Sequence, residues 1–256
     1  MLIDTHTHIY GPEFDEDREE VILRAKEAGV NHLILPAVNE ESVPRMRQMK
    51  SLYPDYCSMA IGLHPEDVRT NYLQQLQFVK DELQTGDYIA VGEIGIDLYW
   101  DKTFQQEQEE AFLLQVQWAI EQDLPLIIHT RDSLHRTLQL LEPYKHKNLK
   151  GVFHCFGGNV EDAEAIFRMG DFKLGIGGVL TFKNSSLAQT LKNVPVDKII
   201  LETDSPYLAP VPKRGKRNEP ALLIHLLPHL MDIYQCDEET LCKTLKQNTI
   251  NLFGEN

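Results

Sequence analysis

The feature that most constrains this chain is a regular alternation of short apolar segments with longer amphipathic ones. The short segments are rich in Ile, Leu and Val, which is typical of strands buried in a parallel sheet. The longer segments repeat apolar residues at helical spacing; in 15–28, Val21, Ile22 and Ala25 share one face, and Gly29 ends the helix. The eight predicted strands are 2–4, 32–36, 58–62, 88–92, 124–129, 151–154, 173–176 and 198–201.

Eight strand-and-helix units share 256 residues, or 32 residues for each unit. This alternation implies a parallel sheet of the α/β class, and eight units favour closure into a TIM-type (β/α)8 barrel. An open doubly wound sheet is the alternative. We expect a single domain over 1–256, with a barrel that can depart from the regular form. Two further C-terminal helices are expected within 218–253, and 206–220 is predicted to be the longest loop.

Net charge, cysteine content and motifs exclude several classes of protein. The chain carries 25 basic and 39 acidic side chains, a formal charge of −14, so its overall field does not attract nucleic acid. Its four cysteines form no C-x-x-C pair, which argues against a zinc ribbon or a redox motif. No basic leader and no apolar run of about 18 residues is visible, and no glycine-rich nucleotide-binding loop occurs. We therefore expect a cytoplasmic protein that makes only local contacts with any nucleic acid.

Polar residues gather where the predicted strands end. In a barrel, all the C-terminal strand ends converge on one mouth, where catalysis takes place. Residues that lie far apart in the sequence are therefore expected to meet in one pocket. The strand-end residues are Asp4, His6, His8, His64, Glu93, Asp97, His129, Arg131, His154, Glu202 and Asp204.

The pair His6 and His8 is the first candidate for metal binding. Spacing of two on an extended segment puts both imidazoles on one side of the chain, which suits a cation such as zinc. Solvated histidines at a polar strand end would show the same pattern. Glu93 lies in an apolar stretch, where a buried carboxylate needs a metal or an opposite charge, and an ion pair with Arg131 is the alternative.

The other strand ends supply more ligands and polar groups. His129 and His154 each follow an apolar strand; alone, either would fit a hydrogen-bonded core histidine. Asp204 could bind a metal and accept a proton from water, or cap a turn before Ser-Pro. Arg131 is a candidate clamp for phosphate or carboxylate, or the partner of a strand-end acid. His64 is a catalytic or substrate-binding candidate. Four histidines and two carboxylates can serve two metal ions if one carboxylate bridges them.

One dense basic run stands out in this acidic chain. Lys213, Arg214, Lys216 and Arg217 lie within five residues, in the loop after the last predicted strand. The run would lie near the same mouth and could bind an anionic polymer, although a solvated surface loop has the same composition.

At these residues the sequence resembles the TatD family of metal-dependent deoxyribonucleases, within the amidohydrolase-like barrels. The resemblance covers essentially the whole chain, and the order of its segments makes it specific. The matching segments begin at Ile3 (Ile-Asp-Thr-His-Thr-His), Gly62 (Gly-Leu-His-Pro), Gly92 (Gly-Glu-Ile-Gly-Ile-Asp), His129 (His-Thr-Arg), His154 (His-Cys-Phe), Glu202 (Glu-Thr-Asp-Ser-Pro) and Arg217 (Arg-Asn-Glu-Pro).

The resemblance implies a two-metal site on a TIM-type barrel. His6, His8 and Asp204 would hold one divalent ion, His129 and His154 the other, and Glu93 would bridge them. No Lys lies at a matching strand end, so Glu93 takes the place that a carbamylated lysine has in related amidohydrolases. The family name favours magnesium, whereas histidine-rich ligation favours zinc or manganese.

The implied activity is hydrolysis of DNA phosphodiester bonds, as an exonuclease, by water activated at the metal pair. Catalytic roles would fall to Asp204, Glu93, Arg131 and His64. Substrate binding would fall to Arg131, Lys213, Arg214, Lys216 and Arg217. A metal-dependent amidase or lactonase on the same barrel is the alternative activity, because a fold alone does not determine function. Arg131 and the basic run favour the phosphodiesterase, since a neutral cyclic amide needs neither. No membrane contact and no obligate protein partner are expected.

Overall fold

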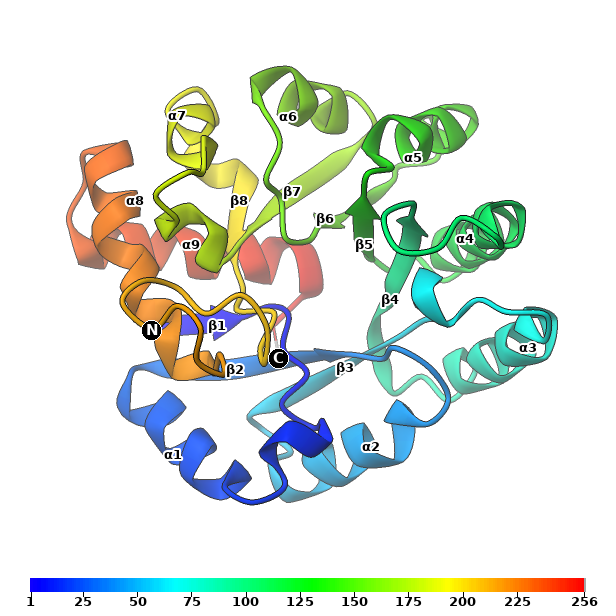
Figure 1. Ribbon diagram of the computed structural model, residues 1–256, viewed down its shortest axis with the longest axis horizontal. Coiled ribbons are helices and arrows are strands. Elements are labelled where there is room, and N and C mark those ends of the chain that lie inside the picture. The colour runs from blue at the N-terminus through cyan, green and yellow to red at the C-terminus, as the bar shows by residue number, and fades with distance from the viewer. Residues whose placement is uncertain (256) are drawn as a thin grey trace.

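The computed structural model describes residues 1–255, and within them eight parallel strands form one sheet in the order β1 to β8. Each strand pairs with the next along the chain, so the colours of Figure 1 follow one another around a ring. The strands are β1 (Leu2–Asp4), β2 (Val30–Pro36), β3 (Cys57–Ile61), β4 (Tyr88–Asp97), β5 (Leu126–Arg131), β6 (Lys150–Phe153), β7 (Asp171–Ile176) and β8 (Ile199–Leu201).

The ring is closed between β1 and β8 by a short set of backbone hydrogen bonds. Thr5 N donates to Leu201 O at 3.0 Å, and Asp204 N donates to His6 O at 2.9 Å. A parallel bridge joins Thr7 to Ser205 just beyond the two strands. The fold is therefore the expected (β/α)8 barrel rather than an open doubly wound sheet, and its seam is made by the residues that follow the first and last strands.

Helices surround the strands on the outside of the ring (Figure 1). The expected C-terminal helices are α8 and α9, preceded by a 3₁₀ helix at Pro220–Leu226. The expected loop is present and ends at residue 219, just before this 3₁₀ helix begins. Within residues 1–255, no helix combines the length and apolar character needed to cross a membrane. The α-helices are α1 (Arg18–Glu27), α2 (Ser42–Leu52), α3 (Tyr72–Leu83), α4 (Gln105–Glu121), α5 (Leu134–Leu141), α6 (Val160–Phe167), α7 (Leu187–Leu191), α8 (Leu227–Tyr234) and α9 (Glu238–Phe253).

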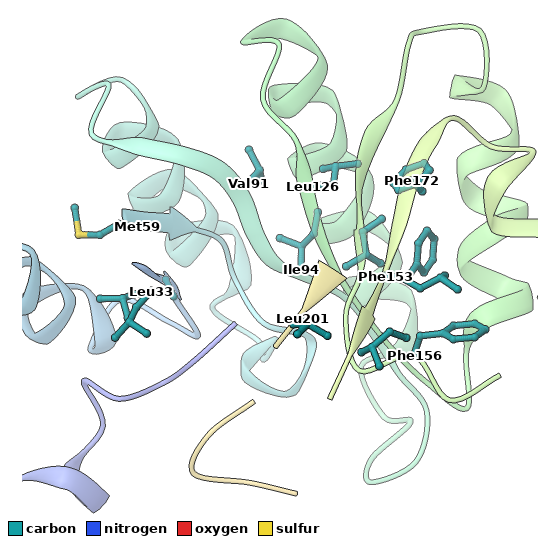
Figure 2. Packing of buried hydrophobic residues seen from close by; sticks show 14 of the residues in the cluster. Leu33, Met59, Val91, Ile94, Leu126, Phe153, Phe156, Phe172 and Leu201 are labelled. Atoms are coloured by element: carbon teal, nitrogen blue, oxygen red, sulfur yellow. The ribbon is translucent and has the colours of Figure 1, made fainter. Parts of the chain in front are cut away.

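The core has two layers because successive residues of a strand face opposite sides of the sheet. In β2, Leu33 and Leu35 belong to the large cluster between sheet and helices, and Ile34 belongs to a smaller one. Figure 2 shows part of the large cluster, including Phe153 and Phe172, whose rings meet edge to face at 5.2 Å. The smaller cluster fills the barrel interior and is closed by α9. It contains Ile34, Ala60, Ala90, Ile127, Val152, Ile200, Leu252 and Phe253.

Strand β4 is longer than the sequence pattern indicates, and this difference matters for the site. The prediction that Glu93 and Asp97 follow the strand is wrong, because β4 continues to Asp97 and pairs with β5 along this stretch. Gly95 makes the pairing possible. Its φ is +149°, and a Cβ at this position would lie 1.9 Å from the carbonyl oxygen of His129. Because Gly92 and Gly95 interrupt the run of apolar residues, the sequence pattern does not predict this part of the strand. The same glycines let β4 approach β5 closely.

Candidate metal centre

The six predicted metal ligands and His64 lie together at the C-terminal end of the barrel. His6 and His8 follow β1, and Asp204 follows β8, so these three side chains lie at the seam. Glu93 points inward from β4 and is 3% exposed. We call the following seven residues the centre: His6, His8, His64, Glu93, His129, His154 and Asp204.

One oxygen of Glu93 faces the seam. Glu93 Oε2 lies 3.1 Å from His6 Nε2 and 3.6 Å from His8 Nε2. Asp204 Oδ1 lies 3.7 Å and 3.6 Å from the same two nitrogens. Asp204 has a left-handed backbone with φ of +56°, a conformation that Asp adopts more readily than most residues. These four groups form the seam half of the centre, and Arg131 is not the partner of Glu93.

The other oxygen of Glu93 faces three histidines from neighbouring strands. Glu93 Oε1 lies 2.9 Å from His154 Nε2, 3.0 Å from His129 Nδ1 and 3.2 Å from His64 Nε2. His129 Nδ1 and His154 Nε2 are 3.2 Å apart. We call this group the β4–β6 half of the centre. The single carboxylate of Glu93 therefore joins the two halves.

Neighbouring polar groups determine which nitrogen of each imidazole carries the proton. Tyr10 Oη donates to Pro36 O at 2.6 Å, so it must accept from His8 Nδ1 at 2.9 Å, and the lone pair of His8 Nε2 faces the centre. His129 Nε2 lies 3.0 Å from Asp97 Oδ2 and donates to it, so the lone pair of Nδ1 also faces the centre. Tyr10 and Asp97 thus orient two imidazoles so that a lone pair of each faces the centre.

His64 has the opposite arrangement. Its Nδ1 accepts the backbone N–H of Glu66 at 3.1 Å, so in the neutral ring the proton is on Nε2. His64 therefore presents a donor to Glu93 Oε1, whereas a metal ligand must present a lone pair. This geometry fits the expected catalytic or substrate-binding role of His64 better than a role as a ligand.

Positive charge between the carboxylates and the imidazoles would stabilise the centre. Burial alone would raise the pKa of Glu93, but the imidazoles of His154, His64 and His6 outweigh burial and hold its pKa well below the usual value. Burial alone would lower the pKa of His154, but Glu93 and Glu202 raise it well above the usual value. Burial lowers the pKa of His6. Protons can supply the charge, and divalent cations can supply it with better geometry.

The residues present therefore fit metal ions. Lone pairs of His8 and His129 face the oxygens of an ionised Glu93, which is repulsive unless a proton or a cation lies between them. Within residues 1–255, His6 Nδ1 and His154 Nδ1 are buried without a hydrogen-bond partner. Imidazole and carboxylate ligands in this ratio suit zinc or manganese on chemical grounds.

Acids at three strand ends support the centre from behind its ligands. Asp97 binds His129, and its Oδ1 also accepts the backbone N–H groups of Tyr99 and Trp100. Hydrogen bonds from His129 and these N–H groups outweigh burial and lower the pKa of Asp97 to about 2. Glu202 Oε1 lies 3.6 Å from His154 Nδ1. The position of these acids at strand ends is visible in the sequence, but it does not separate ligands from supporting groups.

Asp4, the third of these acids, ties the two sides of the seam together. Its Oδ1 accepts from Thr203 N at 2.9 Å and from His6 N at 3.3 Å, and its Oδ2 accepts from the Thr203 hydroxyl at 2.6 Å. Burial raises the pKa of Asp4 to about 7 despite these hydrogen bonds. Asp4 therefore fixes the segments that carry His6 and Asp204 without itself facing the other ligands.

Arg131 lies at the rim of the mouth rather than inside the centre. Its guanidinium carbon is 4.1 Å from the ring centroid of Tyr99 and 5.0 Å from that of Trp100. Tyr99 and Trp100 are 52% and 64% exposed, so the three side chains form an open platform, which we call the aromatic platform. The expected alternative, an ion pair between Arg131 and a strand-end acid, is not present within residues 1–255.

The basic run divides into cations with different roles. Arg217 donates to both oxygens of Asp17 at 2.8 and 2.7 Å and lies 4.5 Å from the ring centroid of Phe14. It therefore holds the loop against the segment before α1, and substrate binding by the four cations stays a prediction. Arg214 stacks on Phe182 at 3.8 Å, and Lys213 and Lys216 are exposed.

A barrel with this centre at its C-terminal mouth defines a class, the metal-dependent hydrolases built on (β/α)8 barrels. The family model described as TatD related DNase matches residues 3–254. The chain belongs to the TatD family of metal-dependent hydrolases, as the resemblance of its motifs indicates.

Individual relatives cover the whole chain. A protein of Bacillus subtilis strain 168 named uncharacterized metal-dependent hydrolase YabD is 34% identical over 257 residues, 100% of both chains. The 3'-5' ssDNA/RNA exonuclease TatD of Dickeya dadantii strain 3937 is 32% identical over 258 residues, which are 98% of this chain and 97% of that protein. The crystal structure of YjjV, a TatD homologue from Escherichia coli K12, superposes with a TM-score of 0.90 at 30% identity, covering 100% of this chain and 98% of that one.

Proposed function

We propose that this protein hydrolyses phosphodiester bonds of DNA, as an exonuclease, with two divalent cations in the centre. The observation that carries the proposal is the position of Glu93. Its Oε2 is within 3.6 Å of the seam histidines, and its Oε1 is within 3.0 Å of His129 and His154. A carboxylate with one oxygen in each of two ligand groups is the arrangement that a pair of bridged cations requires.

Each half of the centre would hold one cation. His6, His8 and Asp204 would bind one cation, His129 and His154 would bind the other, and Glu93 would share one oxygen with each. When bound, such a pair supplies Lewis acidity that lowers the pKa of water and stabilises charge on the phosphate oxygens. Asp97 and Glu202 lie behind His129 and His154, where their negative charge raises the basicity of both imidazoles as ligands.

The remaining side chains have roles in the reaction. Asp204 is held ionised by His8 and His154, which outweigh its burial and lower its pKa, so it can take the proton of the attacking water. The water oxygen bonds to phosphorus as the bond from phosphorus to the leaving sugar oxygen breaks, and the proton passes to that oxygen. His64 Nε2–H, which lies 3.2 Å from Glu93 Oε1, would donate to a phosphate oxygen bound near Glu93. Arg131, from its place on the aromatic platform, would hold a neighbouring phosphate.

Single-stranded nucleic acid fits this mouth for two reasons. The aromatic platform offers exposed ring faces on which an unpaired base can stack, and such stacking contributes about 1–3 kcal/mol per base. A relative from Dickeya dadantii is named a 3'-5' ssDNA/RNA exonuclease, which supports the same substrate class here. The net charge of −14 confines the attraction to local cations, so affinity should be modest and should fall as salt rises.

A parallel activity screen tests the proposal. The protein, loaded in turn with magnesium, manganese and zinc, is given single-stranded DNA labelled at either end, duplex DNA, RNA, a nitrophenyl phosphodiester and a set of cyclic amides and lactones. We expect stepwise shortening of single-stranded DNA and slower cleavage of the duplex. Opening of the cyclic amides or lactones by a protein that cleaves no phosphodiester would show that the phosphodiesterase assignment is wrong.

A further inference from the structure

A second cavity opens on the same end of the barrel, outside the centre. It has a volume of about 600 Å³, and Phe182, Lys183, Asn184 and Ser185 line one side of it while Arg214 lines the other. Cavities that bind small ligands usually have between about 300 and 1,000 Å³. The volume is therefore enough for one nucleotide. None of the residues proposed to hold cations contributes to it.

A hydrogen bond to a side chain and one close backbone approach hold the two sides of this cavity together. The N–H of Val211 donates to Thr181 Oγ1 at 2.9 Å, which ties the 206–220 loop to the 3₁₀ helix Gly178–Thr181. The 206–220 loop and the 3₁₀ helix touch directly at Gly178, where a Cβ would lie 2.0 Å from Leu208 O. The cavity is thus built into the fold and does not depend on the chance position of two loops.

The charge of the cavity is opposite to that of the molecule. Lys183 and Arg214 are the only charged side chains in its lining, and both are positive. Within residues 1–255, neither makes an ion pair, whereas Arg217 in the same loop is paired with Asp17. Two such cations at one cavity, in a chain with a net charge of −14, indicate a site for an anion, and apolar residues such as Val179 and Val211 complete its lining.

The contact between Arg214 and Phe182 adds a surface that can bind both a phosphate and a base. The guanidinium carbon lies 3.8 Å from the ring centroid, so the phenyl ring contacts the guanidinium directly. A guanidinium in such a contact offers N–H groups to phosphate oxygens and a flat face to a base. These are the groups that a nucleotide presents together.

The cavity and the centre share one strand end. Asp204 of the centre immediately precedes the loop that carries Arg214, and the cavity wall at 182–185 follows the 3₁₀ helix after β7. We propose that the cavity is a secondary subsite, which binds a nucleotide of the same strand away from the bond at the centre, with its phosphate against Lys183 and Arg214. The inference rests on the proposed function and adds a second contact with the strand, away from the bond that is cleaved.

The test is the dependence of turnover on substrate length. The kcat/KM for a hexathymidylate is divided by that for a dithymidylate, in the wild type and in Lys183→Ala/Arg214→Ala. A dithymidylate without terminal phosphates has one phosphate, so none is left for the cavity when that bond lies at the centre. We therefore expect this ratio to fall about tenfold in the variant, the effect of removing charged hydrogen bonds to phosphate. The slope of log kcat/KM for the hexamer against log salt should flatten by about 0.7 for each phosphate that the variant no longer neutralises.

Lys80→Ala/Lys243→Ala is the matched control, because it removes the same charge from exposed positions on α3 and α9. It should keep the wild-type ratio. An unchanged ratio in Lys183→Ala/Arg214→Ala, or an equal fall in the control, overturns the subsite. If the double variant does not fold, Lys183→Gln, at an exposed position, replaces it with a smaller expected fall.

If the proposed function is wrong, the experiment gives a result that differs from the loss of the subsite alone. In that case the wild type cleaves neither oligonucleotide in the presence of any of the metals. Binding of a fluorescent hexathymidylate, measured by anisotropy, then tests the cavity by itself. Weaker binding to Lys183→Ala/Arg214→Ala than to the control supports the subsite, and equal binding overturns it.

Discussion

The centre and the rim of the mouth hold their polar side chains in different ways. In the centre, His129 is 13% exposed and lies between Glu93 and Asp97, each at 3.0 Å. At the rim, Arg131 and Arg214 lie on aromatic rings and make no ion pair within residues 1–255. The centre is therefore an interlocked unit in which one change disturbs several neighbours. The rim is a set of separate cations whose removal should have local effects.

The largest effect on turnover is expected from substitution of Glu93, which faces both halves of the centre. Glu93→Gln removes the negative charge from both halves, so both cation sites should weaken and turnover should fall by about 10³-fold, the scale of several kcal/mol of charge stabilisation. Metal content by mass spectrometry and the rate of DNA cleavage measure the two effects. Near-normal turnover with both cations bound would show that Glu93 does not join the halves, and circular dichroism must show a folded variant.

A smaller effect on metal affinity is expected when the group that hydrogen-bonds to a histidine of the centre is removed, and its size should depend on whether that group is charged or neutral. Asp97→Asn removes the carboxylate behind His129, and Tyr10→Phe removes the neutral hydroxyl behind His8. Loss of a supporting carboxylate should weaken metal affinity about 10- to 100-fold, and loss of the hydroxyl about fivefold, because hydrogen bonds to charged groups are stronger. Titration calorimetry with manganese gives both values. The comparison fails if Tyr10→Phe weakens binding as much as Asp97→Asn.

At the rim, Trp100→Ala tests the aromatic platform. The exposed indole should stack on an unpaired base, so its loss should raise KM for single-stranded DNA about tenfold and leave metal content intact. Trp100→Phe should recover most of the affinity, and Leu73→Ala on α3 serves as an equally exposed control. A change in metal content without a change in KM would instead indicate that the indole positions the backbone N–H that Trp100 donates to Asp97, and so supports the centre.

The smallest effect belongs to Arg217, which the structure pairs with Asp17. Arg217→Ala should lower the free energy of unfolding by about 0.5–1 kcal/mol, the range of partly exposed ion pairs, with KM for DNA almost unchanged. Arg217 holds the pKa of Asp17 below its usual 3.8. The stabilisation is therefore fully present above about pH 4 and is lost as pH falls through the lower pKa of the folded state. Urea unfolding of both proteins at pH 7 and pH 3 should show the full deficit only at pH 7.

The contrast between centre and rim also explains what could be predicted from the sequence. The proposed ligands lie at or near the C-terminal ends of strands, and the geometry of a barrel brings these ends together, so the pattern locates His6, Glu93 and Asp204 without a structure. The role of His64 depends on one backbone N–H, that of Glu66, which no pattern contains. Glycines hide the second half of β4 from the pattern, which places Glu93 and Asp97 beyond the strand instead of within it.

Rim residues are harder to predict because loops determine their partners. Arg217 is part of an obvious basic run, yet its partner Asp17 lies 200 residues away in the sequence. Lys183 follows Phe182 in a segment without charge clustering, and only the approach of the 206–220 loop makes it one wall of a cavity. Sequence composition identifies such cations, but it does not distinguish those that bind an anion from those that hold the fold together.

The central claim is that the two halves of the centre bind two cations joined by Glu93. Electron paramagnetic resonance during titration of metal-free protein with Mn²⁺ tests it most directly, because ions about 3.5–4 Å apart on a shared carboxylate couple magnetically. We predict that two Mn²⁺ ions bind per chain, that a coupled spectrum appears as the second ion binds, and that Glu93→Gln abolishes the coupling. Binding of a single ion, or of two ions that keep the separate six-line spectrum of isolated Mn²⁺, would contradict the account.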